Sequence, residues 1–572
     1  MSLSGKVDWF GRKLVMQSPD FEKVASPENI GNGLLHTGRL VPVYPETSLV
    51  SSKWLRNRIS HLLAQTEMVE FLPENLLSEF DLPNIAGALS SIHFPKTPKE
   101  AELARHRFAF EELFLLHLTV FERKKAWSEV KVNWEIKIPE KEVAEFISSL
   151  PFELTFAQKR AVEELLFDLK QKKAMNRLLE GDVGTGKTVV AALGAFVVAK
   201  NGLQTAVMAP TQILANQHYN TLRNLLEPYR INVELITGDK SSASMVKNSS
   251  RPGSAKPDVI VGTHALLHSR AKRLIHKLAF VVVDEQHKFG VQQRASLLEN
   301  IAHILTMTAT PIPRTVALSL YGDLDLSILD EMPMGRQKIT TWLVPPQKRE
   351  GAYRWIEDQI KSGSQAFIVC PLIEESEVET MKGVKAATAE FKHLSHGVFP
   401  NLKLGLLHGR MKGDEKENTL EKFRKGKTDI LVSTPVVEVG IDIPNATIMM
   451  VEAADRIGLS QLHQLRGRVG RGNKKSYCLL FTELPSPKVL GRLQAMEEAK
   501  TGAELAELDL RLRGPGELFG TKQHGFTQLK VASFSDLRLI HKTRDAAEKF
   551  FPRLEEYPEL LNRLKTHPVV PN

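Results

Sequence analysis

Short apolar runs alternate with longer segments of helical periodicity from about residue 151 to residue 485. Each run is rich in β-branched residues, as expected for strands that are buried on both faces of a sheet. The first block of runs contains LQTAVMAP, DVIVGT, LAFVVVDE and ILTMTAT, and the second contains QAFIVCPL, LKLGLLHG, DILVST and ATIMMVE. Strands that alternate with helices form parallel, doubly wound sheets. The pattern therefore predicts two tandem α/β lobes, residues 151–335 and 336–485, with a cleft between them.

The chain before these lobes has a different pattern. Residues 1–48 contain short β-like pieces separated by turn residues, whereas residues 49–150 contain amphipathic helical stretches such as 99–121. Pro139 and Pro151 flank the break that leads into the first lobe. We therefore expect a small β segment and a helical linker ahead of the two lobes.

The composition is that of an ordinary globular protein. With 572 residues the chain is expected to form several domains, because a single core stops growing near about 250–300 residues. The formal net charge of +9 indicates a polyanionic partner only weakly, since a merely solvated surface would explain it almost as well.

The cysteines and the apolar runs indicate the cellular compartment. Cys370 and Cys478 each lie in an apolar, strand-like run without a neighbouring cysteine at zinc-site spacing, so both are predicted to be buried core thiols. The amino terminus lacks the apolar core of a signal peptide, and the longest apolar run, residues 189–199, is too short to span a bilayer. We expect a cytoplasmic protein without membrane segments.

Residues 181–188 read GDVGTGKT, the complete G-x-x-x-x-G-K-T pattern of a phosphate-binding loop. Its glycines are Gly181, Gly184 and Gly186. Glycines let backbone N–H groups turn toward phosphate oxygens, and the following helix adds its N-terminal dipole. Lys187 is expected to reach the β- and γ-phosphates of ATP, and Thr188 to ligate Mg²⁺. The alternative is a glycine turn that caps a helix, but the entering strand and the apolar helix after the loop favour nucleotide binding.

An acidic pair completes the predicted nucleotide site. Asp284 and Glu285 follow the apolar run LAFVVV, at the strand end where open α/β sheets bind ligands. Asp284 is expected to hold Mg²⁺ through water, and Glu285 to orient and deprotonate the attacking water. The alternative is that these are two carboxylates in an ordinary solvated loop. The presence of the phosphate-binding loop in the same sequence makes this the weaker interpretation.

Together these residues resemble the superfamily 2 helicases, whose Walker B tetrad is here Asp284-Glu285-Gln286-His287. The resemblance implies that the lobes are RecA-like and that Gln158, in PFELTFAQKRAV, reads adenine. Further stretches are similar to the family's motifs Ia, III, V and VI, and they are APTQILANQH (209–218), MTATPIPRT (307–315), STPVVEVGIDIPNA (433–446) and QLHQLRGRVGRG (461–472).

The last of these stretches places a dense arginine loop in the second lobe. An arginine finger requires such a loop facing the phosphate site of the first lobe. Arg468 and Arg471 are the candidates, with Gln464 nearby. A basic face that binds the nucleic-acid backbone is the alternative, which the complete first-lobe site makes the weaker interpretation.

The resemblance also implies that hydroxyls in loops of both lobes grip DNA phosphates without reading bases. The candidates are Thr211, Thr263, Ser433 and Thr434. ATP would then bridge and close the lobes, and hydrolysis would open them. As isolated residues, each of the four is more typical of an ordinary turn hydroxyl.

Three stretches outside the lobes resemble the RecG family of these helicases. Residues 92–118 are similar to its linker helix, and residues 529–547 are similar to its carboxyl-terminal helix. Residues 507–525 resemble the translocation motif that RecG shares with the transcription-repair coupling factor Mfd. The resemblance implies a helical hairpin hook and carboxyl-terminal helices over residues 486–572. Candidates for phosphate contact or for locking the hook are Arg492, Arg511, Arg513 and Gln523. A helix that ends at the glycines of residues 514–516 explains the same pattern, and both interpretations can hold together.

The sequence departs from the family in three ways. Ala503 stands where the family usually has an aromatic residue, which is expected to loosen the packing of the hook, and Gln212 and Asn216 stand where motif Ia commonly has acids. Residues 1–48 resemble only the final portion of an OB-like wedge domain, because a five-stranded barrel needs more chain than about 45 residues. Either an upstream segment is missing or the wedge is truncated, and a poor preference for forks is then expected.

The RecG resemblance implies an ATP- and Mg²⁺-dependent translocase that remodels branched double-stranded DNA, through reversal of stalled forks and migration of Holliday junctions. It further implies a nucleoid-associated monomer that contacts single-strand-binding protein. An Mfd-like translocase is a second hypothesis, against which the linker helix and the lack of a recognisable polymerase-binding module speak. A non-catalytic nucleic-acid clamp is a third, and the complete set of catalytic candidates disfavours it.

Overall fold

A computed structural model describes the chain in two compact units, one formed by residues 1–122 and 526–572 and the other by residues 123–525. The described residues are 2–22, 34–236, 256–267, 274–285, 302–310, 316–317, 319, 322–333, 337–370, 387–435, 443, 445–470, 472, 474–482, 486–499, 501–513 and 529–566. The helix α4 (Pro98–Ser128) continues from the first unit into the second.

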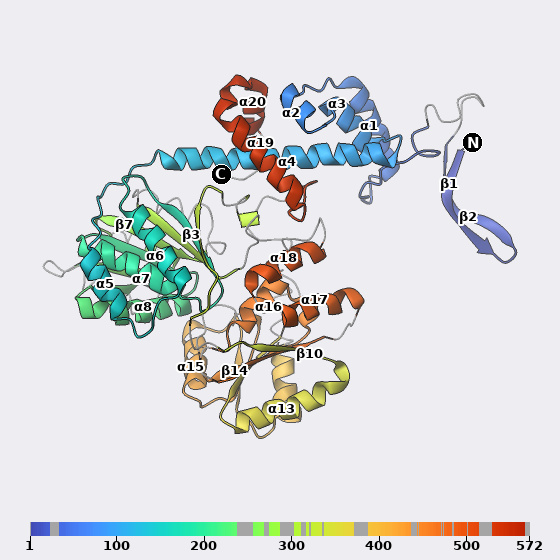
Figure 1. Cartoon of the computed structure of the whole chain (residues 1–572). Helices are drawn as coiled ribbons and strands as arrows, with labels where there is room; N and C mark the ends of the chain where they lie inside the picture. The colour runs from blue at the N-terminus through green and yellow to red at the C-terminus, as the bar shows by residue number, and fades with distance from the viewer. Residues whose placement is uncertain are drawn as a thin grey trace. The chain divides into compact units, whose positions relative to one another are not determined.

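The first lobe is a parallel sheet with helices on its faces (Figure 1), as the alternating pattern predicts. Its strand order is β5-β6-β4-β7-β8-β3-β9, and every neighbouring pair is parallel. The strands are β3 (Asn176–Gly181), β4 (Gln204–Met208), β5 (Val233–Ile236), β6 (Val259–Gly262), β7 (Leu278–Asp284), β8 (His303–Thr308) and β9 (Asp325–Leu329). The helices are α5 (Glu140–Ser148), α6 (Phe156–Leu169), α7 (Lys187–Lys200) and α8 (Gln212–Leu226), with short 3₁₀ turns at Glu227–Tyr229 and His264–Leu267.

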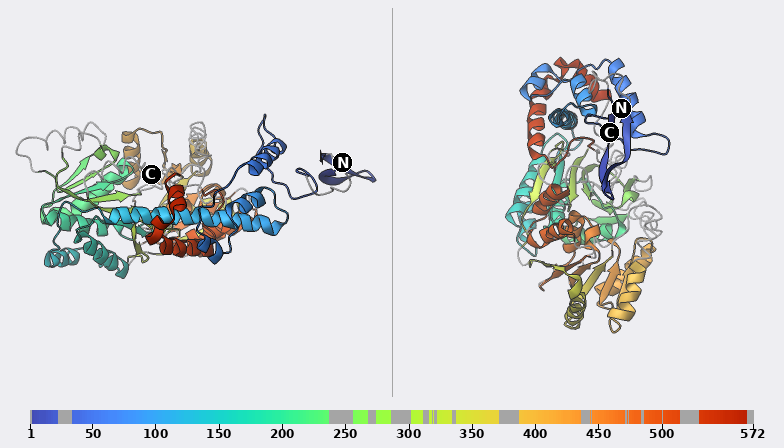
Figure 2. Two further views of the ribbon diagram at one scale, coloured as in Figure 1. Left: turned by 90° about the horizontal axis from the view of Figure 1, so that it is seen from above. Right: turned by 90° about the vertical axis from the view of Figure 1, so that its right-hand side faces the viewer.

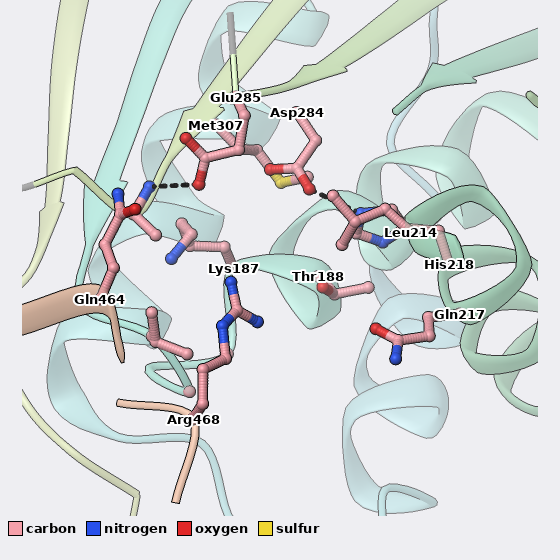
Figure 3. A pocket seen from close by; sticks show the side chains of 14 residues that line it. Lys187, Thr188, Leu214, Gln217, His218, Asp284, Glu285, Met307, Gln464 and Arg468 are labelled. Atoms are coloured by element: carbon pink, nitrogen blue, oxygen red, sulfur yellow. Dashed lines mark hydrogen bonds and ion pairs between the residues drawn. The ribbon is translucent and has the colours of Figure 1, made fainter. Parts of the chain in front are cut away.

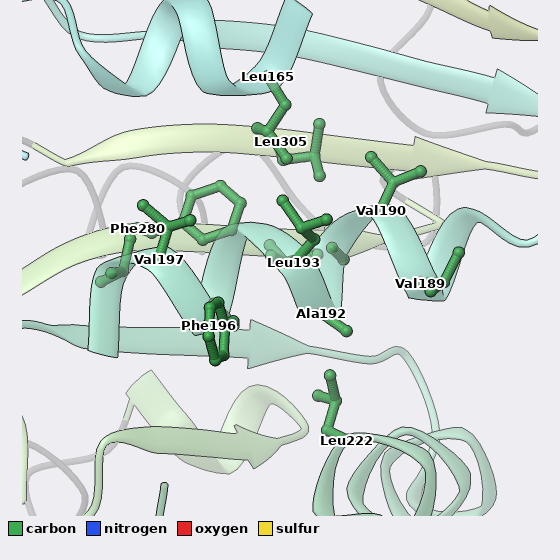
Figure 4. Close-up of a cluster of buried hydrophobic side chains, with 14 of the residues drawn as sticks. Leu165, Val189, Val190, Ala192, Leu193, Phe196, Val197, Leu222, Phe280 and Leu305 are labelled. Atoms are coloured by element: carbon green, nitrogen blue, oxygen red, sulfur yellow. The ribbon is translucent and has the colours of Figure 1, made fainter. Parts of the chain in front are cut away.

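The helix α7 lies at the centre of this lobe's core (Figure 4). Its residues Val189–Val198 are all buried, because the helix is apolar on every side and contacts both the sheet and neighbouring helices. A Cβ atom on Gly194 would lie 2.7 Å from Cε1 of Phe280 on β7, so a glycine is needed for this close contact between helix and strand. Burial of this helix holds the phosphate-binding loop, which directly precedes it, at the edge of the sheet.

The second lobe is a six-stranded parallel sheet with the order β10-β15-β14-β11-β13-β12. The strands are β10 (Thr340–Val344), β11 (Gln365–Val369), β12 (Leu404–Leu407), β13 (Ile430–Ser433), β14 (Ala446–Val451) and β15 (Tyr477–Phe481). The helices are α13 (Arg349–Lys361), α15 (Gly413–Arg424), α16 (Leu459–Arg466), α17 (Pro487–Glu498) and α18 (Gly502–Arg513), with short turns at Pro346–Lys348, Leu394–Val398 and Ala454–Arg456. Two parallel RecA-like sheets confirm the predicted fold class.

Both cysteines are buried free thiols in the second lobe, as predicted. Burial raises the pKa of each thiol, that of Cys478 to about 12, so neither is a reactive thiolate at neutral pH. None of the described helices is long and apolar enough to cross a membrane.

The described elements of the first unit are helices and one β-hairpin. Its helices α1 (Ser52–Gln65), α2 (Glu74–Glu79), α3 (Ile85–His93), α19 (Leu537–Phe550) and α20 (Pro558–Thr566) accompany α4, with a 3₁₀ segment at Phe551–Glu556. Figure 2 shows α4 nearly end-on in its right-hand view, with blue N-terminal and red C-terminal helices beside it. The ring of Phe114 on α4 meets that of Phe550 edge-on at 6.1 Å, which brings the two ends of the chain into one core.

A buried ion network links α4 to the segment that precedes α2. The fully buried guanidinium of Arg107 on α4 donates to Glu111, at 2.6 Å, and to Glu70, at 2.9 Å. Loss of one partner from such a network typically costs about 3–5 kcal/mol, because it leaves an uncompensated buried charge.

The amino-terminal hairpin pairs β1 (Ser2–Phe10) with β2 (Lys13–Glu22) in antiparallel register. It exposes large apolar side chains, among them Trp9 and Phe10. Two strands are compatible with the tail of an OB-like wedge, and the wedge assignment of residues 1–48, like the other domain limits, remains a prediction.

Candidate functional site: a nucleotide pocket between the two lobes

The phosphate-binding loop connects β3 to α7 in the way that its sequence predicts. Gly184 and Gly186 have φ angles of +86° and +88°, a region that L-residues rarely adopt. A Cβ atom on Gly186 would lie only 2.2 Å from Nε2 of Gln158. At Gly181, where the strand ends, a Cβ atom would lie 2.6 Å from Oγ1 of Thr185. The loop therefore needs glycine for its conformation and for its close contacts.

Lys187, the first residue of α7, turns back over the loop. Its Nζ donates to the carbonyl oxygens of Gly181, at 2.6 Å, and of Asp182, at 3.1 Å. Burial lowers the pKa of this lysine, and the nearby carboxylates of Glu285 and Asp284 oppose that effect. The ammonium is thus held at the mouth of the loop, where a phosphate chain would need neutralisation.

Gln158 contacts the loop from behind. It lies in the first turn of α6, where its side-chain oxygen accepts from the N–H of Thr155, and its Nε2 donates to the carbonyl of Thr185 at 2.8 Å. The side chain is buried and is not among those that line the pocket described below. The structure therefore places Gln158 as a support of the phosphate-binding loop, and adenine recognition by it remains a prediction.

Asp284 is the last residue of β7, and its carboxylate is held by a residue that the motifs did not single out. Nε2 of His218, on α8, lies 2.8 Å from Oδ2 of Asp284 (Figure 3). Burial raises the pKa of Asp284, but the contact with His218 and the charges of Lys187 and Arg468 outweigh that effect and keep it below the usual value. Asp284 is therefore a carboxylate at neutral pH.

His218 ends the stretch APTQILANQH (209–218), but nothing in that stretch marks it as the partner of Asp284. A single histidine on a helix is more often part of a core than of a site, and its partner Asp284 is 66 residues away. Only the sheet order, which places β4 beside β7, brings the start of α8 to the end of β7.

Glu285 has a strained backbone, with a φ of +52°. Its N–H donates to the carbonyl of Met307, and its Oε1 accepts from the N–H of Ala309 at 3.2 Å. Non-glycine residues in this region cost about 1–3 kcal/mol and occur preferentially at functional sites. Glu285 lines the same pocket as the other candidate residues.

The second lobe contributes Gln464 and Arg468, both mostly buried. Nε2 of Gln464 donates to Oγ1 of Thr310 in the first lobe at 2.8 Å, so the lobes are in direct contact at this point. Arg471, the other finger candidate, lies outside the described residues.

These side chains surround a cavity of about 250 Å³ (Figure 3). It is lined by Val183, Gly184, Gly186, Lys187, Thr188, Leu214, Gln217, His218, Asp284, Glu285, Met307, Ala309, Gln464 and Arg468. Cations and carboxylates from two lobes that meet at one cavity are what phosphoryl transfer between nucleotide and water requires.

The chemistry of the oxygen ligands fits a magnesium ion. Thr188 and Asp284 both line the cavity and offer a hydroxyl and a carboxylate. Magnesium favours such hard oxygen ligands, and it usually binds one or two protein groups together with phosphates and water. Among the described residues, no group of three or more histidine, cysteine, aspartate or glutamate side chains could hold a metal ion.

The candidates for DNA contact are not brought together in the same way. Oγ1 of Thr211 accepts from the N–H of Leu214 and caps α8, and that of Thr263 accepts from the N–H of Ala265. These are the local hydrogen bonds that ordinary turn hydroxyls make.

Two further candidates, Ser433 and Thr434, are almost completely buried. Among the described residues their hydroxyls have no hydrogen-bond partner. A direct contact with a DNA phosphate therefore needs a rearrangement of this loop, and the contact remains a prediction.

The four hook candidates are only partly placed. Arg492, on α17, donates to the carbonyl of Asp455, which fastens α17 to the turn Ala454–Arg456 of the same lobe. Arg511 and Arg513 lie on α18, but their side chains, like the whole of Gln523, lie outside the described residues.

Comparison with known proteins decides the family. The chain is 41% identical over 511 residues to the ATP-dependent DNA helicase RecG of Bacillus subtilis, and the match covers 88% of this chain and 74% of that protein. The chain belongs to the RecG family of ATP-dependent DNA helicases. Family models agree with this assignment. Residues 155–319 match the model of the DEAD/DEAH box helicases, and residues 348–473 match that of the helicase conserved C-terminal domain. Residues 499–562 match the model of the C-terminal part of domain 3 of the ATP-dependent DNA helicase RecG.

The RecG proteins of Synechocystis sp. and Thermotoga maritima are each 43% identical to the chain, over 561 and 526 residues. These matches cover 96% and 91% of this chain, but 66% and 67% of the two relatives. The chain thus spans about two thirds of their length. A solved structure of RecG bound to a three-way DNA junction matches 96% of this chain and 70% of that chain, with 37% identity and a TM-score of 0.71.

Proposed function

We propose that this RecG-family chain hydrolyses ATP, with Mg²⁺, to move along double-stranded DNA and remodel its branches. The observation that supports it best is the pocket itself, in which Lys187, Asp284 and Glu285 of the first lobe meet Gln464 and Arg468 of the second. A nucleotide in this cavity would contact both lobes, so that its binding and hydrolysis can change how they are held together.

Each side chain has a chemical task in this proposal. Lys187 neutralises the phosphates, and Glu285 orients the attacking water and accepts its proton. Arg468 stabilises the charge that develops on the transferred phosphoryl group, as an arginine finger does. Thr188 and Asp284 would hold Mg²⁺, which supplies further neutralisation of phosphate charge when bound.

Branched DNA as the substrate is a proposal supported by the relative that binds a three-way junction. The phosphate grip would be electrostatic, so its affinity should fall steeply with salt and have little sequence preference. The reversal of stalled forks and the migration of Holliday junctions follow from the same proposal.

The family resemblance also supports three finer proposals. The chain works as a monomer, it is associated with the nucleoid, and it contacts single-strand-binding protein. Sedimentation of the chain with and without single-strand-binding protein tests the first and the third directly.

The test of the proposed function is phosphate release by the wild-type chain and by Lys187→Ala, each without DNA, with linear duplex and with a fork. The control is Lys200→Ala on the same helix, which removes a partly exposed pair with Glu142 and a cation–π contact with Phe196, both away from the pocket lining. We expect stimulation by fork DNA in the wild type and in the control, and loss of hydrolysis in Lys187→Ala. Wild-type turnover in Lys187→Ala would contradict the assignment of the pocket.

A further inference from the structure

Asp182 belongs to the phosphate-binding loop, but it is not among the residues that line the nucleotide pocket. The carbonyl of Asp182 accepts from the N–H of Thr185, at 3.2 Å, and from Nζ of Lys187, at 3.1 Å. Its carboxylate instead contacts two groups outside the first lobe, one on α16 and one at the start of α18. Oδ1 lies 3.0 Å from Nε2 of His463 on α16, and Oδ2 accepts from the N–H of Gly502, the first residue of α18, at 3.1 Å.

The hydrogen-bond network assigns the direction of the contact with His463. Nδ1 of His463 lies 2.9 Å from a guanidinium nitrogen of Arg466. Arginine can only donate, so Nδ1 accepts and carries no proton. The ring proton is therefore on Nε2, which donates to Asp182. Burial raises the pKa of Asp182, but the hydrogen bonds from His463 and Gly502 and the charge of Lys187 hold it below its usual value, so this acceptor is a carboxylate.

The network ends at the junction of α17 and α18. Another nitrogen of Arg466 donates to the carbonyl of Met496, in the last turn of α17, at 2.9 Å. The N–H of Gly502 is one of the donors that the first turn of a helix leaves unpaired, and Oγ1 of Thr501 accepts from another, that of Glu504. Asp182 thus supplies, from the other lobe, part of the cap of α18, and its negative charge suits the positive end of the helix dipole.

Close packing at the same place makes the contact sensitive to lobe position. A Cβ atom on Gly467, directly after α16, would lie 3.0 Å from Cβ of Val183, the residue next to Asp182. Because Asp182 belongs to the first lobe, a separation that lengthens its two hydrogen bonds beyond about 3.5 Å breaks both. The cap of α18 is therefore complete only while the loop and α16 are in contact.

We infer that Asp182 is a positioning residue that transmits the state of the phosphate-binding loop to the helical pair α17–α18, through His463 and the N–H of Gly502. The inference rests on the proposed function, because it concerns how hydrolysis is coupled to movement. The loop that surrounds the phosphates is then connected to the helical pair through the side chain of Asp182, and a change in the loop backbone alters the junction of α17 and α18.

The first test is hydrogen exchange of the Gly502 amide in the full chain, with a non-hydrolysable ATP analogue bound. We expect at least tenfold faster exchange in Asp182→Asn than in the wild type. An asparagine side chain has one oxygen, so it can accept well from only one of the two donors. Its NH₂ group then faces the other donor and cannot accept from it. Asp330→Asn, at an exposed ion pair with Arg160, is the control and should exchange like the wild type. Equal exchange in all three proteins would overturn the inference.

The second test compares two substitutions of His463. His463→Gln keeps an N–H donor near the position of Nε2, whereas His463→Leu removes it. We expect the base pairs remodelled per ATP hydrolysed to fall at least tenfold in His463→Leu and to recover partly in His463→Gln. A proportional loss of hydrolysis and remodelling in both, with lowered thermal stability, would show a purely structural role and overturn the inference. These substitutions also serve if Asp182→Asn does not fold.

The outcomes separate the inference from the proposed function. A wild-type chain that hydrolyses ATP but does not remodel branched DNA would contradict the proposed function. The exchange of the Gly502 amide needs no remodelling, so it tests the positioning role in either case.

Discussion

Gly186→Ala should disable nucleotide binding through two separable costs. The φ of +88° at this position costs an L-residue about 1–2 kcal/mol. The added Cβ would lie 2.2 Å from Nε2 of Gln158, so the amide must move and lose its 2.8 Å hydrogen bond to the carbonyl of Thr185. An unpaired buried group of this kind costs about 1–3 kcal/mol. The two costs together disfavour the loop conformation by about 2–5 kcal/mol. Where this cost falls on the bound state, each 1.4 kcal/mol weakens nucleotide binding about tenfold.

Gly363→Ala is the matched control, because Gly363 has the same φ of +88° and no atom within 4 Å of the added Cβ. The assay is the Kd of a fluorescent ATP analogue, with thermal unfolding measured in parallel. Gly186→Ala should bind at least tenfold more weakly than the wild type, whereas Gly363→Ala should bind normally and lose only stability. The double variant Gly186→Ala with Gln158→Ala should lose less nucleotide-binding free energy than the sum of the losses in the two single variants. The reason is that removal of the Gln158 amide leaves room for the added Cβ atom. Normal nucleotide affinity in Gly186→Ala would refute this reasoning.

Three further predictions concern single side chains. Arg468→Ala should keep nucleotide binding and lose about 10³-fold in hydrolysis, measured by single-turnover phosphate release, because a finger acts on charge that develops during the reaction. His218→Ala should weaken magnesium binding, measured by titration with Mn²⁺ as a probe, because Asp284 loses the group that orients it; an unchanged affinity would contradict that role. Burial lowers the pKa of His117 to about 3, so only the unfolded chain gains this proton as the pH falls below about 6.5. Stability should therefore drop by about 2 kcal/mol between pH 7 and 5, and His117→Leu should show a smaller drop in thermal unfolding over that range.

The two lobes could be predicted from the sequence because buried parallel strands have a local signature. Runs such as LAFVVV are apolar on both faces, and the turn residues and helical segments between them leave few other arrangements. The phosphate-binding loop is also local, since its glycines, Lys187 and Thr188 lie within eight consecutive residues. Such features depend on short stretches of chain, and the structure reproduces them.

Contacts between residues that lie far apart in the sequence have no such local signature. His218 and Gln158 both lie in motifs that the sequence reveals, yet their partners depend on the strand order and on the packing of α6 against the loop. Ser433 and Thr434 show the converse, because a motif indicates phosphate contact while their position at the end of β13 buries their side chains. A motif thus identifies which residues matter, but the topology decides what each one touches.

The link through Asp182 could not have been found in the sequence for a more specific reason. Its partners lie 281 and 320 residues further along the chain, and one of them is a backbone N–H. A backbone donor places no demand on residue type, so Gly502 has no chemical signal, and the aspartate reads as a variable position within G-x-x-x-x-G-K-T. The resemblance assigned coupling to Arg492, Arg511, Arg513 and Gln523, whose side chains give the sequence a chemical signal. If the exchange of the Gly502 amide depends on Asp182, the coupling begins at the phosphate-binding loop itself, and the arginines act only after the helical pair has been positioned.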